Sequence, residues 1–397
     1  MSKVVVIGAG ASGIIAALKA SERHDVILVD GNASIGKKIL LTGNGRCNYW
    51  NEDIDIKNYH TDNKLALDNI LCKKDEVLLY LKELCIFPKI KNGYYYPYSN
   101  QASSIREIFA RAIELSTVEF IPNFKVNNID KLDNIFIVSS NDTQIKCDKV
   151  IIATGSLAYP KTGSDGLGLI FAESFGHTIN PVTPALTKLI SRDSLVKSCE
   201  NVRCDARLTL IIDDQNRESE EGELQITKNG ISGIVTYNIS SEASRALYNN
   251  NNVYVSINFL PRINDFYNWF NELNEAIPNK TLEEMFESLF NYKLMYKILD
   301  KADLRPENRW KNLTTQEKIA LANAIENYKI RIVDTDSFDN AQVATGGVSL
   351  DEIKPTMESE KIKNLYMVGE LLDVDGKCGG FNLAFAFISG YIAGENI

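Results

Sequence analysis

Short apolar runs separated by polar and glycine-containing segments dominate the first part of the chain. Lys3–Ile7 and Asp25–Val29 are rich in β-branched residues, as is typical of strands buried in a parallel sheet, and Ile14–Ser21 between them has helical spacing. Similar runs predict further strands at Thr117–Ile121, Lys125–Ile129, Ile135–Ser139 and Gln144–Ile152. This order of elements predicts an α/β fold whose later strands include a small β-meander.

Two segments depart from this pattern. Residues 60–116 show apolar positions at helical spacing around an aromatic run, Tyr94–Tyr98, which either lines a pocket or packs as a hairpin. From residue 187 the pattern predicts an antiparallel unit followed by helices, with Glu220-Glu221 as a solvated turn. At about residue 336 the first pattern returns, with a last parallel strand at Leu365–Val368 and a buried helix from about Asn382. We therefore expect one domain built from residues 1–186 and 336–397, interrupted by an inserted domain at 187–335.

The first strand ends in a G-x-G-x-x-G sequence formed by Gly8, Ala9, Gly10, Ala11, Ser12 and Gly13. In such a turn Gly8 permits the sharp bend, Gly10 lets a pyrophosphate approach the backbone, and Gly13 lets helix and strand pack closely. Asp30 ends the second strand, where an acid can accept hydrogen bonds from ribose hydroxyls. The strand, the helix and the acid at this spacing together predict a dinucleotide site.

The segment after Asp30 favours FAD over NAD. A simple NAD domain proceeds to another helix and strand, whereas this chain forms a polar loop spaced by glycines that leave room for a flat ring. The candidate cofactor ligands of this segment are Gly31, Lys37, Lys38, Thr42, Gly43, Asn44, Gly45, Arg46, Cys47 and Asn48.

Several motifs carry a resemblance to a known family. They are T-G-N-G-R-C-N at residues 42–48, A-T-G at 153–155, G-I-S-G at 230–233, G-E-L-L-D at 369–373 and G-G-F-N-L at 379–383. Their sequence and order resemble the BaiN/YhiN-like (aminoacetone oxidase-like) family of bacterial NAD(P)/FAD-dependent oxidoreductases. The resemblance spans nearly the whole chain.

The resemblance implies FAD bound across a Rossmann-like domain of the glutathione-reductase type with an inserted α+β domain. It also implies further cofactor contacts, namely Val126, Ala153, Thr154, Gly155, Gly369, Glu370, Asp373, Gly379, Gly380, Phe381, Asn382 and Leu383. In this type of flavoprotein the final helix points its N-terminus at the flavin ring, and its dipole favours the reduced form. The later run Gly163–Gly168 lacks the strand and helix expected of a second nucleotide site.

Flavin performs the hydride chemistry, so we expect no compact catalytic triad. Tyr159 and Lys161, which follow the central A-T-G, are candidates for an acid–base step. Cys47 is a candidate nucleophile because Arg46 beside it could lower its pKa, although structural packing near the flavin explains it better. His177 is expected to be a helix-end or core residue, and no His/Cys spacing predicts a metal site.

Composition and charge limit the classes of partner and the cellular location that we expect. The chain has 397 residues, 43 Lys and Arg against 52 Asp and Glu, and no long basic cluster, which disfavours nucleic acid as a partner. Seven cysteines without a C-x-x-C pair, no signal-peptide pattern and no apolar stretch long enough for a bilayer predict a cytoplasmic protein.

These features predict an FAD-dependent oxidoreductase that moves a hydride between flavin and a small organic substrate. NAD(P)H as a transient co-substrate and oxygen as an acceptor both stay open, because the chain has one nucleotide fingerprint. The alternatives are a flavin-dependent RNA-modifying enzyme, which the acidic charge disfavours, and a non-catalytic flavin-binding redox sensor. The substrate and the oligomeric state do not follow from the sequence.

Overall fold

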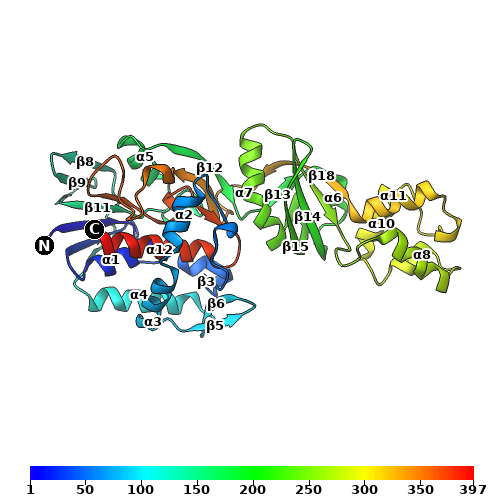
Figure 1. The fold of residues 1–397 in the computed structure, drawn as a ribbon, viewed down its shortest axis with the longest axis horizontal. Coiled ribbons are helices and arrows are strands. Elements are labelled where there is room, and N and C mark those ends of the chain that lie inside the picture. Colours follow the sequence, from blue (N-terminus) through cyan, green and yellow to red (C-terminus); the bar gives the residue numbers. More distant parts are fainter. The chain divides into compact units, whose positions relative to one another are not determined.

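The computed structural model describes all 397 residues, which form two compact units (Figure 1). Unit 1 comprises residues 1–185 and 338–397, and unit 2 comprises residues 186–337. The chain leaves unit 1 at the end of β12 (Ile179–Ala185) and returns to it just before β19 (Val343–Val348). These two strands pair antiparallel, so the exit and the return lie side by side, as an inserted segment requires.

A five-stranded parallel sheet forms the centre of unit 1. Its strands in spatial order are β20 (Leu365–Met367), β11 (Lys149–Ile152), β1 (Lys3–Ile7), β2 (Asp25–Val29) and β7 (Glu119–Ile121). Ile7, Ile152 and Met367 pair across three neighbouring strands, so three loops start side by side at this edge of the sheet. Ligands bind at this edge in open parallel sheets.

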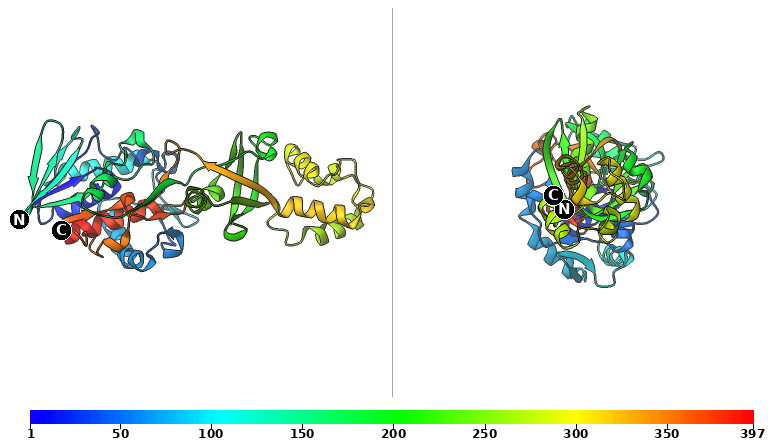
Figure 2. Two further views of the ribbon diagram at one scale, coloured as in Figure 1. Left: turned by 90° about the horizontal axis from the view of Figure 1, so that it is seen from above. Right: turned by 90° about the vertical axis from the view of Figure 1, so that its right-hand side faces the viewer.

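Helices and smaller sheets surround the parallel sheet (Figures 1 and 2). The helices are α1 (Ala11–Ala20), α2 (Lys64–Leu71), α3 (Lys74–Glu83), α4 (Ala102–Leu115), α5 (Leu167–Ser174) and α12 (Phe381–Asn396). The predicted meander is formed by β8 (Asn128–Leu132), β9 (Ile135–Ser139) and β10 (Gln144–Cys147). The short strands are β3 (Trp50–Asn51), β4 (Tyr59–His60), β5 (Pro88–Lys91), β6 (Tyr94–Pro97) and β21 (Asp375–Gly376).

The last helix packs directly against the first. A Cβ atom added to Gly390 of α12 would lie 2.3 Å from the backbone oxygen of Ser12, and one added to Gly394 would lie 2.5 Å from that of Ala16. Most of α12 is buried, as its apolar sequence predicts. The contact also brings the two termini close together through His24, whose Nδ1 accepts from Ser2 N–H at 3.4 Å and whose Nε2 lies 2.8 Å from the backbone oxygen of Ile397.

Unit 2 contains a closed antiparallel barrel of six strands. In spatial order these are β13 (Leu189–Ser191), β16 (Gly230–Ser232), β15 (Gln215–Thr227), β14 (Arg203–Ile212), β17 (Val253–Asn258) and β18 (Tyr328–Thr335). The helices of this unit are α6 (Ser194–Ser198), α7 (Ile234–Tyr248), α8 (Phe266–Ala276), α9 (Leu282–Phe286), α10 (Tyr292–Lys301) and α11 (Thr315–Glu326). Phe266, Phe270, Phe286 and Trp310 form a buried aromatic cluster among them.

The Rossmann-like fold class is confirmed, but some predicted elements are wrong. Glu220 and Glu221 lie inside the long strand β15, and the turn occurs at Asp213-Asp214, where both residues have positive φ. Cross-strand ion pairs such as Arg207 with Glu221 stabilise this polar strand, and a local pattern does not reveal them. The strand predicted to begin at Lys125 begins at Asn128. No helix of the structure has the length and apolarity needed to cross a membrane.

Candidate FAD site

The three glycines of the opening motif differ in what surrounds them. A Cβ at Gly13 would lie 1.9 Å from the backbone oxygen of Gly8, and one at Gly8 would lie 2.5 Å from that of Ala153, so both are needed for packing. Gly10 has an ordinary extended backbone, and a Cβ there would have no atom within 4 Å. The protein itself therefore does not require glycine at position 10, which leaves a ligand as the reason for the open space.

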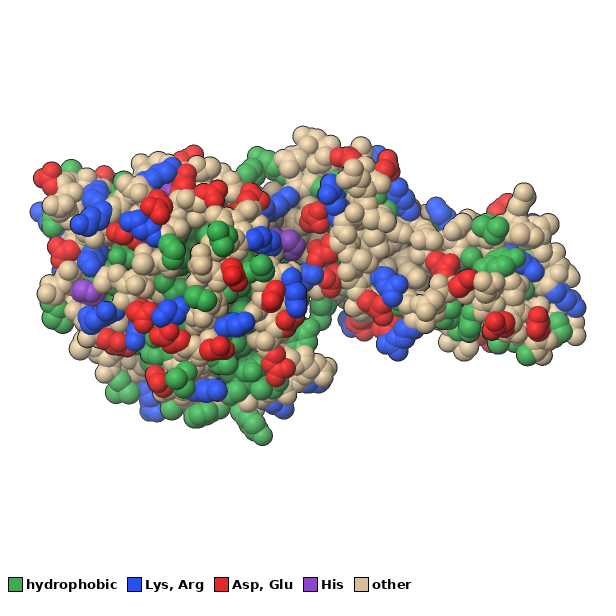
Figure 3. All heavy atoms as spheres, viewed as in Figure 1, with side chains coloured by type: hydrophobic (Ala, Val, Ile, Leu, Met, Phe, Trp, Pro, Cys, Tyr) green, Lys and Arg blue, Asp and Glu red, His purple; other side chains and the backbone are tan.

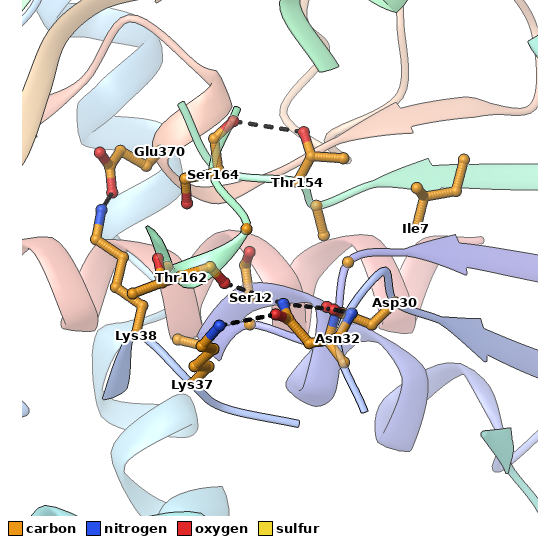
Figure 4. A pocket seen from close by; sticks show the side chains of 18 of the residues that line it. Ile7, Ser12, Asp30, Asn32, Lys37, Lys38, Thr154, Thr162, Ser164 and Glu370 are labelled. Atoms are coloured by element: carbon orange, nitrogen blue, oxygen red, sulfur yellow. Dashed lines mark hydrogen bonds and ion pairs between the residues drawn. The ribbon is translucent and has the colours of Figure 1, made fainter. Parts of the chain in front are cut away.

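This open space is part of a cavity of about 320 Å³ in unit 1 (Figure 4). The cavity runs from the β1–α1 turn past the ends of β2 and β11 to the first turn of α12. Predicted ligands from distant parts of the sequence line it together. They are Gly8, Gly10, Ala11, Ser12, Asp30, Gly31, Lys37, Lys38, Thr42, Val126, Ala153, Thr154, Gly155, Glu370, Asn382 and Leu383.

Three helices begin at this cavity with a glycine as N-cap, and at α5 the Asp165 carboxylate accepts from the backbone N–H of Leu167 at 3.2 Å, so α1 and α12 are the two that start without a side-chain acceptor. The N-cap residues of α1, α5 and α12 are Gly10, Gly166 and Gly380, which have no side chain to accept from the free backbone N–H groups. Uncapped N–H groups and positive helix ends favour an anionic ligand. These helix ends therefore suit the pyrophosphate of FAD and the negative charge that its ring gains on reduction.

Asp30 holds the glycine turn as well as lining the cavity. Its carboxylate accepts from the backbone N–H of Ala9 at 2.7 Å and from that of Asn32 at 2.7 Å. The Asn32 side chain donates to Asp30 and to the backbone oxygen of Thr162 and accepts from Lys37 Nζ at 3.1 Å (Figure 4). The network fixes the carboxylate at the cavity wall, where it can accept from ribose hydroxyls and would repel a 2′-phosphate.

Lys38 and Glu370 link the two halves of the chain within the cavity. Lys38 Nζ donates to Glu370 Oε2 at 2.6 Å (Figure 4), and the backbone N–H of Ala344 donates to Oε1 at 3.1 Å. Both side chains are largely buried, so this pair is screened less than a surface pair. The Lys38–Glu370 ion pair would offer a ligand polar groups in the part of the cavity between the glycine turn and α12.

Other predicted ligands lie outside the cavity wall. Gly43–Arg46 are exposed, and the side chain of Asn48 is placed to donate to the backbone oxygens of Trp50 and Tyr95. Asp373 is buried and accepts from Asn180 at 2.6 Å. Gly379, Gly380 and Phe381 form the start of α12, and Gly369 packs against Ser12 and donates to Ser389 Oγ at 3.0 Å; none of the four lines the cavity, and direct contact of all these residues with FAD stays a prediction.

The sequence did not reveal several residues that line the cavity. Asn32, Phe124, Lys125 and the segment Thr162–Asp165 line it, with Gln342, Val343, Val374, Phe385 and Ala386. The run Gly163–Gly168 is therefore no second nucleotide site but a wall of the first. The A-T-G motif at the end of β11 could have indicated this segment, because residues that follow a parallel strand lie near the edge of the sheet where ligands bind.

Lys125 and Asp165 form an ion pair at 2.8 Å between two different cavity-lining segments. Their side chains are 68% and 36% exposed, so the pair contributes at most about 1 kcal/mol. We expect Lys125→Gln to speed the dissociation of bound FAD at low salt by roughly two- to fivefold, and high salt to remove the difference. Flavin fluorescence measures the rate, and Lys228→Gln, at an exposed lysine of unit 2, is the control. Equal rates at low salt would contradict this role.

Cys47 is fully buried and does not line the cavity. Burial raises the pKa of its thiol to about 11 despite a hydrogen bond with Thr42, so the expected lowering by Arg46 is wrong. Only about one such thiol in ten thousand is ionised at neutral pH, and thiolate is the reactive form. The structure therefore supports packing as the role of Cys47.

We expect iodoacetamide to modify the exposed Cys72 and Cys85 of the native protein at neutral pH and to leave Cys47 unmodified. Peptide mass spectrometry separates the three sites, and unfolding in guanidinium should make Cys47 reactive. Modification of native Cys47 as fast as Cys72 would contradict the burial argument.

The acid–base candidates lie beside the cavity. Tyr159 is half-buried with a left-handed backbone (φ 54°), and its N–H donates to the backbone oxygen of Phe338 at 3.0 Å. Lys161 is exposed, and neither residue lines the cavity. The aromatic run is a strand, β6, paired with β3 and β5, which corresponds to the hairpin alternative.

One Ser–His–Glu chain does occur, in unit 1. His177 Nε2 lies 2.8 Å from Ser359 Oγ, and its Nδ1 lies 3.0 Å from Glu352 Oε2. Ser359 is buried and its hydroxyl accepts from the backbone N–H groups of Lys361 and Ile362. The serine therefore caps a turn and is no accessible nucleophile, and His177 is the core residue that the sequence predicted. No group of three or more His, Cys, Asp or Glu side chains is arranged to hold a metal ion.

A parallel sheet with a ligand cavity at the carboxyl ends of its strands, two uncapped helix starts at α1 and α12, and an acid after β2 are the features of a dinucleotide-binding flavoprotein. A family model described as the HI0933-like protein Rossmann domain matches residues 2–396. The chain therefore belongs to this family, and the resemblance to BaiN/YhiN-like proteins is confirmed.

Relatives match the chain over its whole length. It is 36% identical to a 3-dehydro-bile acid delta(4,6)-reductase of Clostridium scindens, with 100% of the chain and 98% of the relative covered. It is 27% identical to a ribosomal RNA dihydrouridine synthase of Escherichia coli, with 99% and 97% covered. The solved structure of a 3-ketosteroid-Δ4-(5α)-dehydrogenase from Rhodococcus jostii is similar in fold, with a TM-score of 0.52, 12% identity and coverage of 100% and 96%. The chain is an FAD-dependent oxidoreductase.

Proposed function

We propose that the chain reduces a carbon–carbon double bond conjugated with a carbonyl group in a small organic substrate. This proposal rests on the 36% identity between the whole chain and the Clostridium scindens reductase. Its name, like that of the Escherichia coli relative, describes the addition of two hydrogens to such a double bond. The two relatives share this reaction type but act on different substrates. The comparison therefore supports the reaction type more strongly than it supports either substrate.

The residues at the α12 end of the cavity suit this reaction. Bound FAD would supply the electron pair as a hydride. The first turn of α12 contributes Asn382 and Leu383, and its positive end stabilises negative charge near the ring. Val374 and Phe385 make this end apolar and help to exclude water. Tyr159 and Lys161 stay our candidates for delivering the proton that the second carbon requires.

Both polar atoms of the Asn382 side-chain amide form hydrogen bonds that fix its position. Its Oδ1 accepts from the backbone N–H of Gly376 at 2.8 Å, and its Nδ2 donates to the oxygen of the same residue at 2.7 Å. The loop before α12 is thereby tied to the first turn of the helix. A rigid loop here would keep substrate and ring in a fixed geometry, which contributes strongly to rate.

An anaerobic experiment tests the proposal. We expect NADH or NADPH to bleach the bound flavin, and a 4-en-3-one steroid or 2-cyclohexen-1-one to restore the oxidised spectrum with formation of the saturated ketone. The saturated ketones serve as controls that should not reoxidise the flavin. Reoxidation by oxygen but by no enone would contradict the proposal and favour an oxidase. Bleaching by neither nucleotide would remove NAD(P)H as the electron donor.

The relative from Escherichia coli keeps RNA modification as a second candidate. Its identity is lower than that of the bile acid reductase, and the net charge of −9 does not favour a polyanionic partner. On the face shown in Figure 3, lysine and arginine side chains are interspersed with aspartate and glutamate. Dihydrouridine formed in ribosomal RNA by the reduced protein, with no enone reduction, would favour this candidate instead.

A further inference from the structure

One face of the sheet β3–β6–β5 combines aromatic rings with lysines. Lys91 lies opposite Tyr94 and Lys89 opposite Tyr96, and the N–H of Tyr98 donates to the oxygen of Phe87 at 3.1 Å. Directly opposed residues and every second residue of a strand share one face. We call this set the aromatic–lysine face, which consists of Phe87, Lys89, Lys91, Tyr94, Tyr96 and Tyr98.

The opposite face of this sheet is partly covered by the protein itself, although Ile90, which pairs with Tyr95, is 48% exposed. Tyr95 packs edge-on against Tyr49 with ring centroids 6.3 Å apart, and Trp50 beside it is buried. On the aromatic–lysine face, by contrast, Phe87 is 60% exposed and Tyr98 is 74% exposed. Figure 3 shows hydrophobic side chains gathered at the margin of unit 1 where Figure 1 places β5 and β6. Contiguous exposed rings of this kind mark binding surfaces.

The two lysines of this face are exposed, and neither takes part in an ion pair. By contrast, Lys19, Lys57 and Lys73 of unit 1 each form an ion pair with a neighbouring glutamate or aspartate. Two positive charges beside uncovered aromatic rings are complementary to a ligand that is apolar along its body and negative at one end.

The inner end of the face contacts the loop that leads into α12 and through it to the cavity. A Cβ at Gly379 would lie 2.5 Å from the Tyr94 ring, and Asn51 Nδ2 donates to the backbone oxygen of Gly379 at 2.8 Å. Gly379 precedes α12, whose first turn lines the cavity through Asn382 and Leu383. From Tyr94 the face extends outward over Tyr96 to Tyr98, a distance of about 13 Å along the strand.

We propose that the aromatic–lysine face binds the part of the substrate remote from the reacting double bond: a flat apolar body lying on the tyrosines, with a carboxylate or similar anion held by Lys89 and Lys91. This inference rests on the proposed function. Two lysines neutralise one small anion but are few for a nucleic-acid track, which needs many phosphate contacts. Binding energy gained at this distance from the reacting carbons positions them for hydride transfer.

Direct binding to the FAD-loaded protein tests this surface. The probes are cholate, which has a flat apolar body and a carboxylate, and its uncharged methyl ester, both below their micelle concentrations. We expect Lys89→Gln/Lys91→Gln to weaken cholate binding by about fivefold and to leave the ester unchanged. Tyr98→Ala should weaken both probes by about fivefold to tenfold. The matched controls, Lys146→Gln on β10 and Tyr248→Ala in unit 2, should bind as wild type.

Absence of cholate binding, or equal affinity of wild type and these variants, would overturn the proposal. Binding of a single-stranded oligouridine that the lysine variant loses would overturn it in favour of nucleic acid. Reduction of 2-cyclohexen-1-one separates this proposal from the proposed function, since that substrate has no remote body to bind. If wild type and variants all reduce it while cholate affinities are equal, only the surface assignment fails. If wild type does not reduce it, the proposed function fails.

Discussion

Gly10→Val is expected to abolish FAD binding and to leave the fold intact. The extended backbone at Gly10 accepts a β-branched residue, and no protein atom lies within 4 Å of the new Cβ. The side chain would instead fill the open space beside the uncapped N–H groups of α1. Loss of two charge-assisted hydrogen bonds costs about 3–6 kcal/mol, so we expect FAD affinity to fall by roughly 100-fold or more.

The flavin content of the purified variant and its affinity in a titration with FAD measure this effect. Gly222→Val is the matched control, because Gly222 lies in strand β15 of unit 2 and its added Cβ would make an ordinary 3.8 Å contact with Val235. The melting temperatures of the two apoproteins should agree with that of wild-type apoprotein. A Gly10→Val protein that purifies with full FAD content would contradict the assigned site.

Gly390→Leu is expected to destabilise unit 1 itself. The added Cβ would lie 2.3 Å from the backbone oxygen of Ser12, and α1 cannot retreat because Gly13 already touches Gly8. Overpacking typically costs 1–3 kcal/mol, and a clash with fixed backbone lies at or above the upper end. We expect at least about 3 kcal/mol, which corresponds to a fall in melting temperature of roughly 6–12 °C.

Calorimetry of the apoproteins separates this effect from loss of ligand. Asn396→Leu introduces the same side chain at an exposed position of the same helix and should change stability little. Gly390→Leu should also lose FAD, since α12 carries one end of the cavity. An unchanged melting temperature for Gly390→Leu would show that the close packing of α1 and α12 does not contribute as described.

The sequence predicted the parts of the site that depend on local pattern. The strand β1, the glycine turn and α1 follow from β-branched residues, G-x-G-x-x-G and helical spacing within one short segment. Glu370 and Asn382 were found through motifs that resemble a family and not through periodicity. Their place beside Lys38 depends on the pairing of β20 with β11 and on the packing of α12, which act over hundreds of residues.

What the sequence did not reveal depends on contacts between distant segments. The path of residues 43–48 away from the cavity is set by left-handed residues such as Asn44 and Cys47 and by the bond from Cys47 N–H to the oxygen of Thr42. The segment 162–165 became part of the cavity because β11 lies between β1 and β20. The six-stranded barrel closes through the pairing of β13 with β18, which no local pattern indicates.

The flavin content of the protein tests the central claim, a single FAD site built from the beginning and the end of the chain. The absorption spectrum of the purified protein, followed by chromatography of the flavin released on denaturation, measures it directly. The structure predicts flavin bands and about one FAD per chain, from a cavity whose helix starts and glycine turn accommodate a pyrophosphate. A colourless protein that takes up no FAD on incubation would contradict it.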